Sequence, residues 1–210
     1  DFISSVCPEL PTPLTAIKGW AETLMAESED ETIDPQTIRK GMGVILKETD
    51  RLSGMVEELL DFSRMQSGRL KLVMNKLDLL AELSDAVLMF TERAKREGVE
   101  IIYDEPEEFW VIYGDKNRLR QVFVNIIDNA LKYSDNGDKI TITATEFEQF
   151  VHINVEDTGC GISAEDLPKI KTKFYKGNST RRGSGIGLAV ADEIIQMHGG
   201  SINITSREGE

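Results

Sequence analysis

A helix-like stretch in the second half of the sequence, "VNIIDNALKY", carries polar side chains at a spacing that suits cation and anion binding. Asn125 and Asn129 lie four residues apart, so their amides share one helical face, and Lys132 follows about one turn later. An amide oxygen can ligate a hard cation such as Mg²⁺, and a lysine ammonium can contact a phosphate. An ordinary solvated polar face explains the same pattern when the stretch is taken alone.

Two glycine-containing stretches further along suggest a second kind of contact. In "EDTGCGI", Asp157 ends a predicted strand, where its carboxylate can accept a hydrogen bond from an exocyclic amine, and Gly159 and Gly161 let a flat base approach the backbone. In "RRGSGIGLAV", glycines open a predicted helix whose N–H groups and dipole suit a phosphate chain. A plain turn explains the first stretch equally well, and the second lacks the preceding strand of a Rossmann fingerprint.

Alternating strand-like and helix-like segments must position these side chains. From about residue 70 onward, short apolar runs alternate with amphipathic stretches of helical period. The predicted strands are 70–79, 99–104, 109–114, 139–147, 150–157 and a last strand that begins at 201. The predicted helices are 79–98, 115–134 and a glycine-opened helix within 183–200. This order indicates a second unit of alternating strands and helices over residues 71–210, with its final strand truncated.

The first third of the chain predicts a helical hairpin. Apolar residues recur from Ile3 at spacings of three and four, and a second run begins with Asp34 as N-cap and Pro35 as first helical residue. The seam of this second run is Ile38, Met42, Ile45, Thr49, Leu52, Val56 and Leu59. A hairpin of this size buries too little surface to be stable alone, so we expect residues 1–68 to form a dimeric four-helix bundle. The predicted fold class is therefore α+β.

Composition narrows the range of partners. The 210-residue chain has a formal net charge of −13, which argues against a general nucleic-acid or acidic-membrane binder. Its two cysteines, Cys7 and Cys160, favour a reducing compartment over a disulfide framework. No apolar run approaches the roughly 20 residues that span a bilayer. We expect a cytoplasmic chain, or the cytosolic part of a larger protein that meets the membrane only through segments outside this sequence.

The three motifs occur in a characteristic order: Asn-x-x-x-Asn, then Asp-x-Gly-x-Gly, then Gly-x-Gly-x-Gly-Leu. This order resembles the ATP-binding domain of sensor histidine kinases, a Bergerat-type α/β two-layer sandwich shared with type II topoisomerase and Hsp90 ATPases, and the resemblance implies this fold for residues 71–210. The segment "ELPTPLTAIKGWAETL" resembles the dimerisation and phosphoacceptor helix of the same family. The resemblance implies a two-component histidine kinase core that binds ATP and Mg²⁺, forms a homodimer through the hairpin and acts with a response regulator receiver domain.

The resemblance also implies roles for individual residues. Asn125 corresponds to the Mg²⁺ ligand, Asn129 and Lys132 to phosphate-site residues, and Asp157 to the acceptor of the adenine amine. The glycine-rich loop corresponds to the triphosphate site, under a lid formed by residues 176–182. The full predicted nucleotide-binding set is Asn125, Asn129, Lys132, Tyr133, Asp157, Gly159, Gly161, Ile162, Gly185, Gly187 and Leu188.

The acceptor segment departs from the family pattern. The family reads roughly His-Glu-Leu-Arg-Thr-Pro-Leu, whereas this chain has Pro8 at the histidine position and Pro11 at the arginine position. Because proline offers no nucleophile, self-phosphorylation of this helix is predicted to be absent. Glu9 resembles the acid that accepts the histidine proton, and Thr12 resembles the residue that positions water for regulator dephosphorylation. We expect regular helix to begin near Thr12, with Thr12 as N-cap to Pro13.

Other positions in the second domain bear on ATP hydrolysis, on the lid and on the choice of acceptor. ATPases of this fold place a glutamate general base one turn before the metal-ligand asparagine, where this chain has Gln121, which cannot take a proton. Lys171 and Thr172 replace the usual Phe-Glu, so an aromatic beneath the lid is missing. Neither remaining histidine is expected to replace the acceptor: His152 should point to solvent from a strand, and His198 should cap a helix end.

Three functions are compatible with these residues. The leading hypothesis is a histidine kinase core that keeps its nucleotide site, has lost its own phosphoacceptor and acts in trans on an intact histidine. The second is an ATP-binding pseudokinase scaffold, or a residual response-regulator phosphatase that uses Glu9 and Thr12. The third is a slow ATPase, which Gln121 disfavours.

Overall fold

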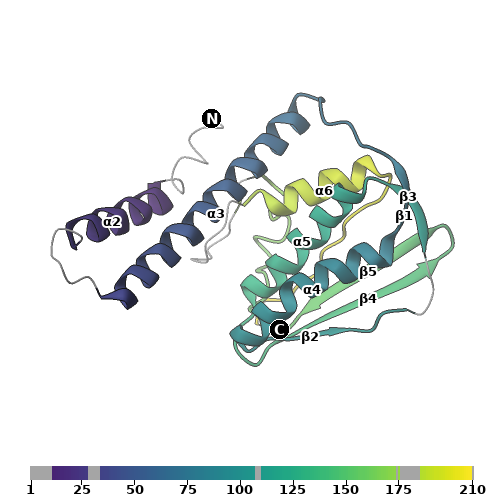
Figure 1. Cartoon of the computed structure of the whole chain (residues 1–210). Helices are drawn as coiled ribbons and strands as arrows, with labels where there is room; N and C mark the ends of the chain where they lie inside the picture. The colour runs from purple at the N-terminus through teal and green to yellow at the C-terminus, as the bar shows by residue number, and fades with distance from the viewer. Residues whose placement is uncertain (1–10, 28–33, 107–109, 174, 176–184, 210) are drawn as a thin grey trace. The chain divides into compact units, whose positions relative to one another are not determined.

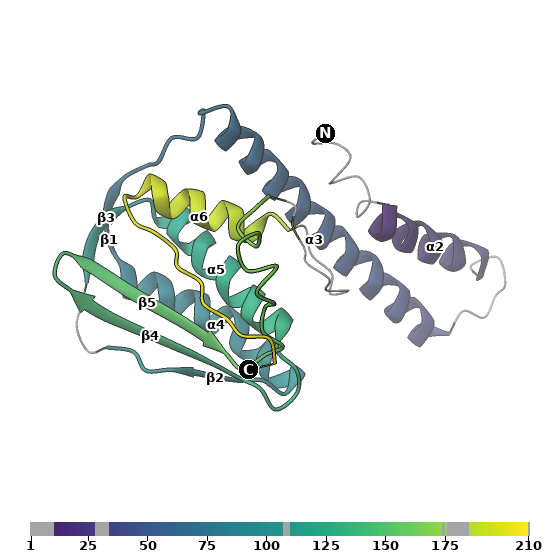
Figure 2. The same cartoon turned by 180° about the vertical axis from the view of Figure 1, so that it is seen from behind.

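The computed structural model of the chain describes residues 11–27, 34–106, 110–173, 175 and 185–209, without the side chains of residues 62 and 66. The chain divides into two compact units, residues 1–68 and residues 69–210. A helical unit followed by a unit that contains a sheet confirms the predicted α+β fold class (Figures 1 and 2). Within the described ranges, no helix is both long enough and apolar enough to cross a membrane.

The ends of the long helix α3 (Pro35–Gln66) are set by its local sequence. Asp34 has an extended backbone, and its carboxylate accepts the N–H of Gln36 at 3.1 Å. The helix closes at Ser67, and Gly68 follows in the left-handed conformation with φ 62°. The predicted N-cap and first-turn proline of this helix are confirmed.

Helix α2 (Pro11–Glu27) begins earlier than the sequence predicted. Thr12 lies inside its first turn, so the prediction that Thr12 is the N-cap is wrong. The first N–H groups of a helix have no intrahelical acceptor, so a proline in the first turn loses no hydrogen bond. Pro11 and Pro13 both occupy this turn, and the helix accommodates both.

A glycine allows α2 and α3 to approach each other closely. A Cβ on Gly41 would lie 2.8 Å from Cε3 of Trp20, and Lys40 Nζ lies 5.9 Å from the centroid of the same indole. Many other apolar side chains of the two helices are exposed: Leu14, Met25, Ile38, Met42, Leu46, Val56 and Leu60. A single copy of the hairpin therefore leaves much of its apolar surface uncovered.

The second unit consists of a sheet layer and a helix layer. Its strands are β1 (Asn75–Asp78), β2 (Glu100–Tyr103), β3 (Val111–Gly114), β4 (Lys139–Phe147) and β5 (Phe150–Asp157). Its helices are α4 (Leu79–Glu97), α5 (Lys116–Tyr133) and α6 (Gly187–Met197). The main sheet has the order β2-β4-β5, with β2 parallel and β5 antiparallel to β4, while β1 and β3 form a separate antiparallel pair. The helices cover one face of the main sheet (Figures 1 and 2).

Alternation along β4 determines which side chains enter the core. Ile140, Ile142 and Ala144 are buried, while Thr141 and Thr143 point to the opposite face and are partly exposed. Large side chains from the helix layer and from the start of α6 complete the core: Leu83, Val122, Ile127, Leu131, Ile186, Val190 and Ile194.

The first predicted strand of this unit, residues 70–79, is shorter in the structure. Only β1 forms a ladder, because the N–H of Val73 donates to the Asp115 carboxylate and Asp78 already serves as the N-cap of α4.

The predicted last strand is not present within residues 201–209 of the structure, although exposure alternates along them. Ile202 O accepts a hydrogen bond from Lys171 Nζ, and Ser206 Oγ accepts the N–H of Ile162. These contacts join the segment to a lysine side chain and to a loop, and the described residues show no ladder between it and a neighbouring strand.

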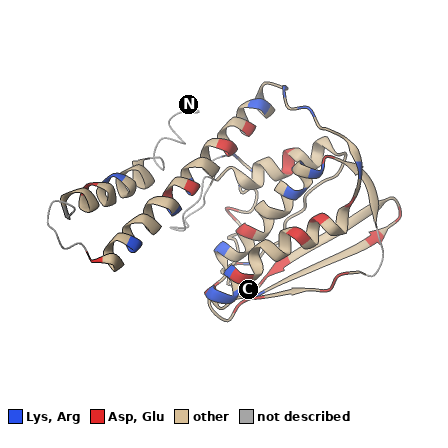
Figure 3. Cartoon of the chain, viewed as in Figure 1, with Lys and Arg blue, Asp and Glu red and all other residues tan. Residues whose placement is uncertain are grey.

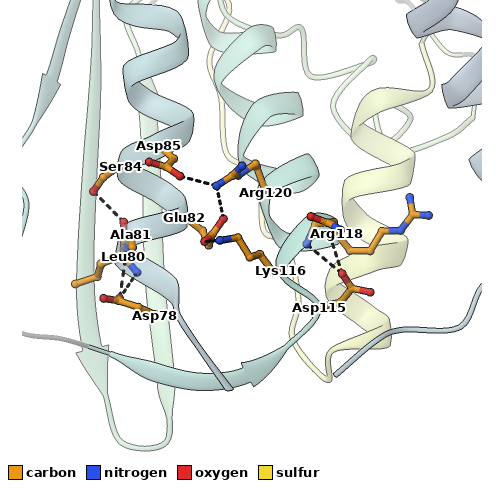
Figure 4. A network of polar contacts seen from close by, with 11 residues as sticks. Asp78, Leu80, Ala81, Glu82, Ser84, Asp85, Asp115, Lys116, Arg118 and Arg120 are labelled. Atoms are coloured by element: carbon orange, nitrogen blue, oxygen red, sulfur yellow. Dashed lines mark hydrogen bonds and ion pairs between the residues drawn. The ribbon is translucent and has the colours of Figure 1, made fainter. Parts of the chain in front are cut away.

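Asp115 fixes the start of α5 (Figure 4). Its Oδ1 accepts the N–H groups of Asn117 and Arg118 at 3.1 and 3.2 Å, and its Oδ2 accepts the N–H of Val73 at 2.8 Å. Its own N–H donates to Nε2 of His198 at 2.9 Å. One buried carboxylate therefore caps α5 and holds the segment that precedes β1.

Replacing Asp115 by alanine is expected to lower the free energy of unfolding by about 2 kcal/mol, because α5 loses its N-cap and the N–H of Val73 loses its acceptor. Asp115→Asn should cost less, since its amide oxygen still caps α5. Chemical denaturation of the wild type and both variants measures the difference. An alanine variant as stable as the wild type would contradict the assigned role.

Glu82 joins α4 to α5 (Figure 4). Its side chain is only 5% exposed, and its carboxylate lies 2.9 Å from Lys116 Nζ and 2.8 Å from an Arg120 guanidinium nitrogen. The same guanidinium contacts Asp85 at 2.5 Å. Two cations thus offset the cost of burying this carboxylate, and the network holds α5 against α4.

Candidate functional site

Asn125 lies on α5 and reaches the start of α6. Its Nδ2 donates to Gly187 O at 3.0 Å, and a Cβ on Gly187 would lie 3.5 Å from the Asn125 amide carbon. The amide oxygen of Asn125 has no hydrogen-bond donor among the described residues, so it keeps its capacity to accept. The structure therefore brings together the asparagine of the first motif and the last glycine of the third.

The N-terminus of α6 has no side-chain cap. The N-cap residue is the buried Ile186, and the first intrahelical bond runs from the Val190 N–H to Ile186 O at 2.9 Å. The amides of residues 187–189 precede this bond, where a helix offers N–H groups and a positive dipole end to an anion. Gly185 has φ 69°, a left-handed conformation that favours glycine. Leu188 is half-buried in the first turn.

The other predicted residues of α5 lie near its C-terminal end. Asn129, Lys132 and Tyr133 are all half-buried. Lys132 Nζ lies 4.8 Å from the centroid of the Tyr133 ring, a cation–π contact. Among the described contacts, none links Asn129 to α6, so its role at a phosphate site stays a prediction.

Asp157 ends β5 in a half-buried position. Its Oδ1 accepts the N–H of Gly159 at 3.1 Å, and no described residue donates a hydrogen bond to its Oδ2. Burial raises the pKa of the Asp157 carboxyl, and the negative charges of Asp138 and Glu156 raise it further, while the Gly159 bond lowers it. The structure thus presents a carboxylate oxygen that can accept a hydrogen bond from a ligand.

The two glycines after Asp157 are required by the protein's own backbone. A Cβ on Gly159 would lie 2.4 Å from Tyr133 O, and a Cβ on Gly161 would lie 2.0 Å from Arg207 O. The sequence pattern predicted that both glycines let a base approach the backbone. In the structure their missing side chains face backbone carbonyls, and this close packing sets the path of the loop.

Gln121 and Lys171 both have defined partners. Gln121 Oε1 accepts a hydrogen bond from Arg118 at 2.8 Å, so the amide at the general-base position is engaged as an acceptor. Lys171 Nζ lies 2.8 Å from Asp192 Oδ1 on α6 and also donates to Ile202 O. The lysine that replaces the family's aromatic therefore links α6 to the following extended segment.

The two histidines take the positions that the sequence predicted. His152 is exposed on β5 and meets Phe147 edge-to-face, with centroids 6.0 Å apart. His198 Nδ1 lies 2.7 Å from Ile194 O, and its Nε2 accepts the N–H of Asp115. The link between His198 and Asp115 was missed in the sequence analysis, because the two residues lie 83 positions apart.

Several predicted functional positions lie outside the described ranges: Pro8, Glu9, Gly183 and the lid segment 176–182, which includes Arg181 and Arg182. Thr12 is described and is exposed on α2.

Comparison with known families assigns both parts of the chain. Residues 114–210 match the family described as histidine kinase-, DNA gyrase B- and HSP90-like ATPase, and residues 1–68 match the His Kinase A (phospho-acceptor) domain. The chain belongs to the histidine kinase family. It contains the helical domain and the ATP-binding domain of a sensor histidine kinase core, which confirms the resemblance inferred from the motif order.

Relatives agree with this assignment. Sensor protein SrrB of Staphylococcus aureus (strain MRSA252) is 32% identical over 214 residues, which cover all of this chain and 36% of the relative. The chain thus spans about a third of the length of the curated relatives it matches. The solved structure of Acinetobacter baumannii histidine kinase AdeS is 26% identical to this chain and superposes with a TM-score of 0.70. The match covers 96% of this chain and 92% of the AdeS chain.

A third comparison supports the fold alone. Histidine kinase ThkA, solved in complex with response regulator protein TrrA, is 23% identical, with a TM-score of 0.67 over 94% of this chain and 54% of the ThkA chain.

Proposed function

We propose that this histidine kinase core binds ATP with Mg²⁺ and transfers the γ-phosphoryl group in trans to an intact histidine of an acceptor-competent partner chain, because its own acceptor position is Pro8. The observation that carries the proposal is the hydrogen bond from Asn125 to Gly187, which holds an amide oxygen beside the uncapped N-terminus of α6. A cation ligand and a set of anion-binding amides thus adjoin each other. This is the combination that a metal-bound polyphosphate requires.

The donor chemistry of Asn125 fits Mg²⁺. Mg²⁺ prefers oxygen donors and takes most of its ligands from water and substrate phosphates, so one amide oxygen from Asn125 is a sufficient protein contribution. When bound, the ion neutralises phosphate charge. Asn125 would hold the ion, and the amides of residues 187–189 and Lys132 would bind the phosphates. Asp157 would orient the base by accepting a hydrogen bond from the adenine amine.

The proposed transfer forms a phosphorus–nitrogen bond on the acceptor imidazole as the bond from the γ-phosphorus to the ADP oxygen breaks. Gln121 supports this direction, because an amide that already accepts from Arg118 is a poor base for activating water. The proton of the acceptor imidazole passes to a carboxylate beside that histidine; Glu9 occupies this place in the acceptor segment and would take the role once position 8 carries a histidine.

We propose a homodimer through residues 1–68 and a response regulator receiver domain as partner. The exposed apolar residues of α2 and α3 support the dimer, since a second copy would cover them. The complex of ThkA with a response regulator, together with the His Kinase A domain, supports the second partner. We propose that this activity takes place in the cytoplasm, because ATP and response regulators are found there.

A pseudokinase scaffold is the second candidate. Pro8 and Pro11 in the acceptor segment and the lysine at position 171 favour it. In that case the chain binds ATP and dimerises without transferring phosphate, with residual regulator dephosphorylation through Glu9 and Thr12 as the only chemistry.

A mixing experiment separates these functions. The acceptor protomer carries Pro8→His, Pro11→Arg and Asn125→Ala, so that it offers a histidine and lacks its own nucleotide site. With γ-labelled ATP, label on this protomer only in the presence of the wild type supports transfer in trans. An unlabelled acceptor beside an ATP-bound wild type would favour the scaffold. Phosphate release without any acceptor would identify an ATPase.

The raised pKa of Asp157 predicts a pH dependence of base selectivity. The ionised carboxylate accepts from the adenine amine, and its raised pKa means that protonation begins at a higher pH than for an ordinary aspartate, near 3.9. As pH falls through this pKa, ATP affinity should drop relative to inosine triphosphate, which lacks the amine. Because the pKa of Asp157 is raised in the folded state, its ionised form lowers the free energy of unfolding at pH values above that pKa. Acidification through the pKa removes this destabilisation.

Binding measured by calorimetry across the acidic range tests this prediction, with Asp157→Asn as control. The ratio of the two affinities should change with pH in the wild type and stay flat in the variant. If the ratio of ATP affinity to inosine triphosphate affinity does not change with pH in the wild type, Asp157 does not contact the adenine amine.

A further inference from the structure

The loop after β5 is held from two sides. We call residues 157–162 the base loop. On one side, the N–H of Cys160 donates to Tyr133 O at 3.2 Å, which fixes the loop to the end of α5. On the other side, the N–H of Ile162 donates to Ser206 Oγ at 2.9 Å, and Cys160 O accepts the N–H of Gly209 at 3.0 Å.

Close packing reinforces the contact between the base loop and the 206–209 segment. Gly161 has φ 67°, and a Cβ there would lie 2.0 Å from Arg207 O, so the backbone of the 206–209 segment occupies the space where a side chain would be. Ser206 itself is half-buried. Its hydroxyl therefore fixes the far end of the base loop by accepting the N–H of Ile162.

We propose that Ser206 is a positioning residue for the base end of the nucleotide site. The inference rests on the proposed function, because it assumes that Asp157 and the base loop receive adenine. Ser206 acts through the Ile162 amide: with this bond in place, the base loop keeps one path between Tyr133 and the 206–209 segment. The phosphate-binding groups lie on α5 and α6 and do not depend on this bond.

This separation predicts a ligand-selective effect. Ser206→Ala removes the acceptor of one neutral, half-buried hydrogen bond, which corresponds to about a threefold to tenfold loss of ATP affinity. Tripolyphosphate with Mg²⁺, which has no base, should bind as it does to the wild type. Ser206→Thr keeps a hydroxyl and should restore ATP affinity, and Thr205→Ala, at the exposed neighbouring position, serves as the matched control.

The experiment measures Mg-ATP and Mg-tripolyphosphate binding by calorimetry for the wild type and the three variants, together with melting temperature and hydrogen exchange at the Ile162 amide. The expected result is a selective loss of ATP affinity and faster Ile162 exchange in Ser206→Ala alone. Unchanged ATP affinity would overturn the proposal. So would equal weakening of both ligands with a lower melting temperature, since that indicates a structural role only.

Failure of the proposed function has a different signature. A wild type that binds neither ligand removes the nucleotide site, and with it the inference, whatever the variants do. A wild type that binds both ligands with Ser206→Ala indistinguishable from it leaves the proposed function standing and removes only the role of Ser206.

Discussion

Replacing Pro8 by histidine and Pro11 by arginine together will make the chain label itself with the γ-phosphate of ATP, whereas the wild type stays unlabelled on this segment. Histidine supplies the nucleophile that proline lacks. Arginine at position 11 restores a backbone N–H and removes a ring that disfavours helix in the preceding turn, so it favours a helical acceptor segment through position 8. The expected change is from no label to a label that is lost on acid treatment, because the phosphorus–nitrogen bond hydrolyses in acid.

The control for this variant separates the nucleophile from the helix. Pro8→Ala with Pro11→Arg allows the same helical extension without an imidazole, and it should stay unlabelled. Pro8→His alone should label poorly, because Pro11 still limits the helix. A double variant that binds ATP, dimerises and remains unlabelled would contradict the view that only the acceptor segment is defective.

Asn125→Ala will lower the affinity for ATP in the presence of Mg²⁺ by about 100-fold, the upper end of the range known for residues that support a metal site. The variant loses the proposed metal ligand and also the hydrogen bond that ties α5 to Gly187 O at the start of α6. Displacement of a fluorescent ATP analogue measures the loss. Without Mg²⁺ the gap between the variant and the wild type should narrow.

Asn117→Ala is the matched control on the same helix, because Asn117 is exposed in the first turn of α5. It should bind ATP like the wild type. If both variants lose affinity equally, the effect of Asn125→Ala reflects damage to α5. If neither loses affinity, Asn125 is not part of a nucleotide site.

The sequence predicted those parts of the fold that depend on local signals. Asp34 with Pro35, and the uninterrupted period of α5, are short-range patterns, and the structure confirms both. The start of α2 was placed too late because three nearby prolines suggested a broken helix. Two of them, Pro11 and Pro13, fall in the first turn, where a missing N–H costs nothing.

Contacts between distant segments could not be predicted in the same way. The motif order identified Asn125 and Gly187 separately, but only the fold shows that one donates to the other. Gly161 was assigned to the ligand because a glycine in a loop commonly admits one, whereas its neighbour is the Arg207 backbone. Ser206 carried no sequence signal, because a single serine in an extended segment resembles any other.

Calorimetric titration of the wild type with ATP, with and without Mg²⁺, tests the central claim most directly. The account predicts binding at or below millimolar ATP that depends on Mg²⁺, which establishes a working nucleotide site in a chain that lacks its own acceptor. Absence of heat and of binding at millimolar ATP with Mg²⁺ would contradict the account and leave a dimerising scaffold as the function of this chain.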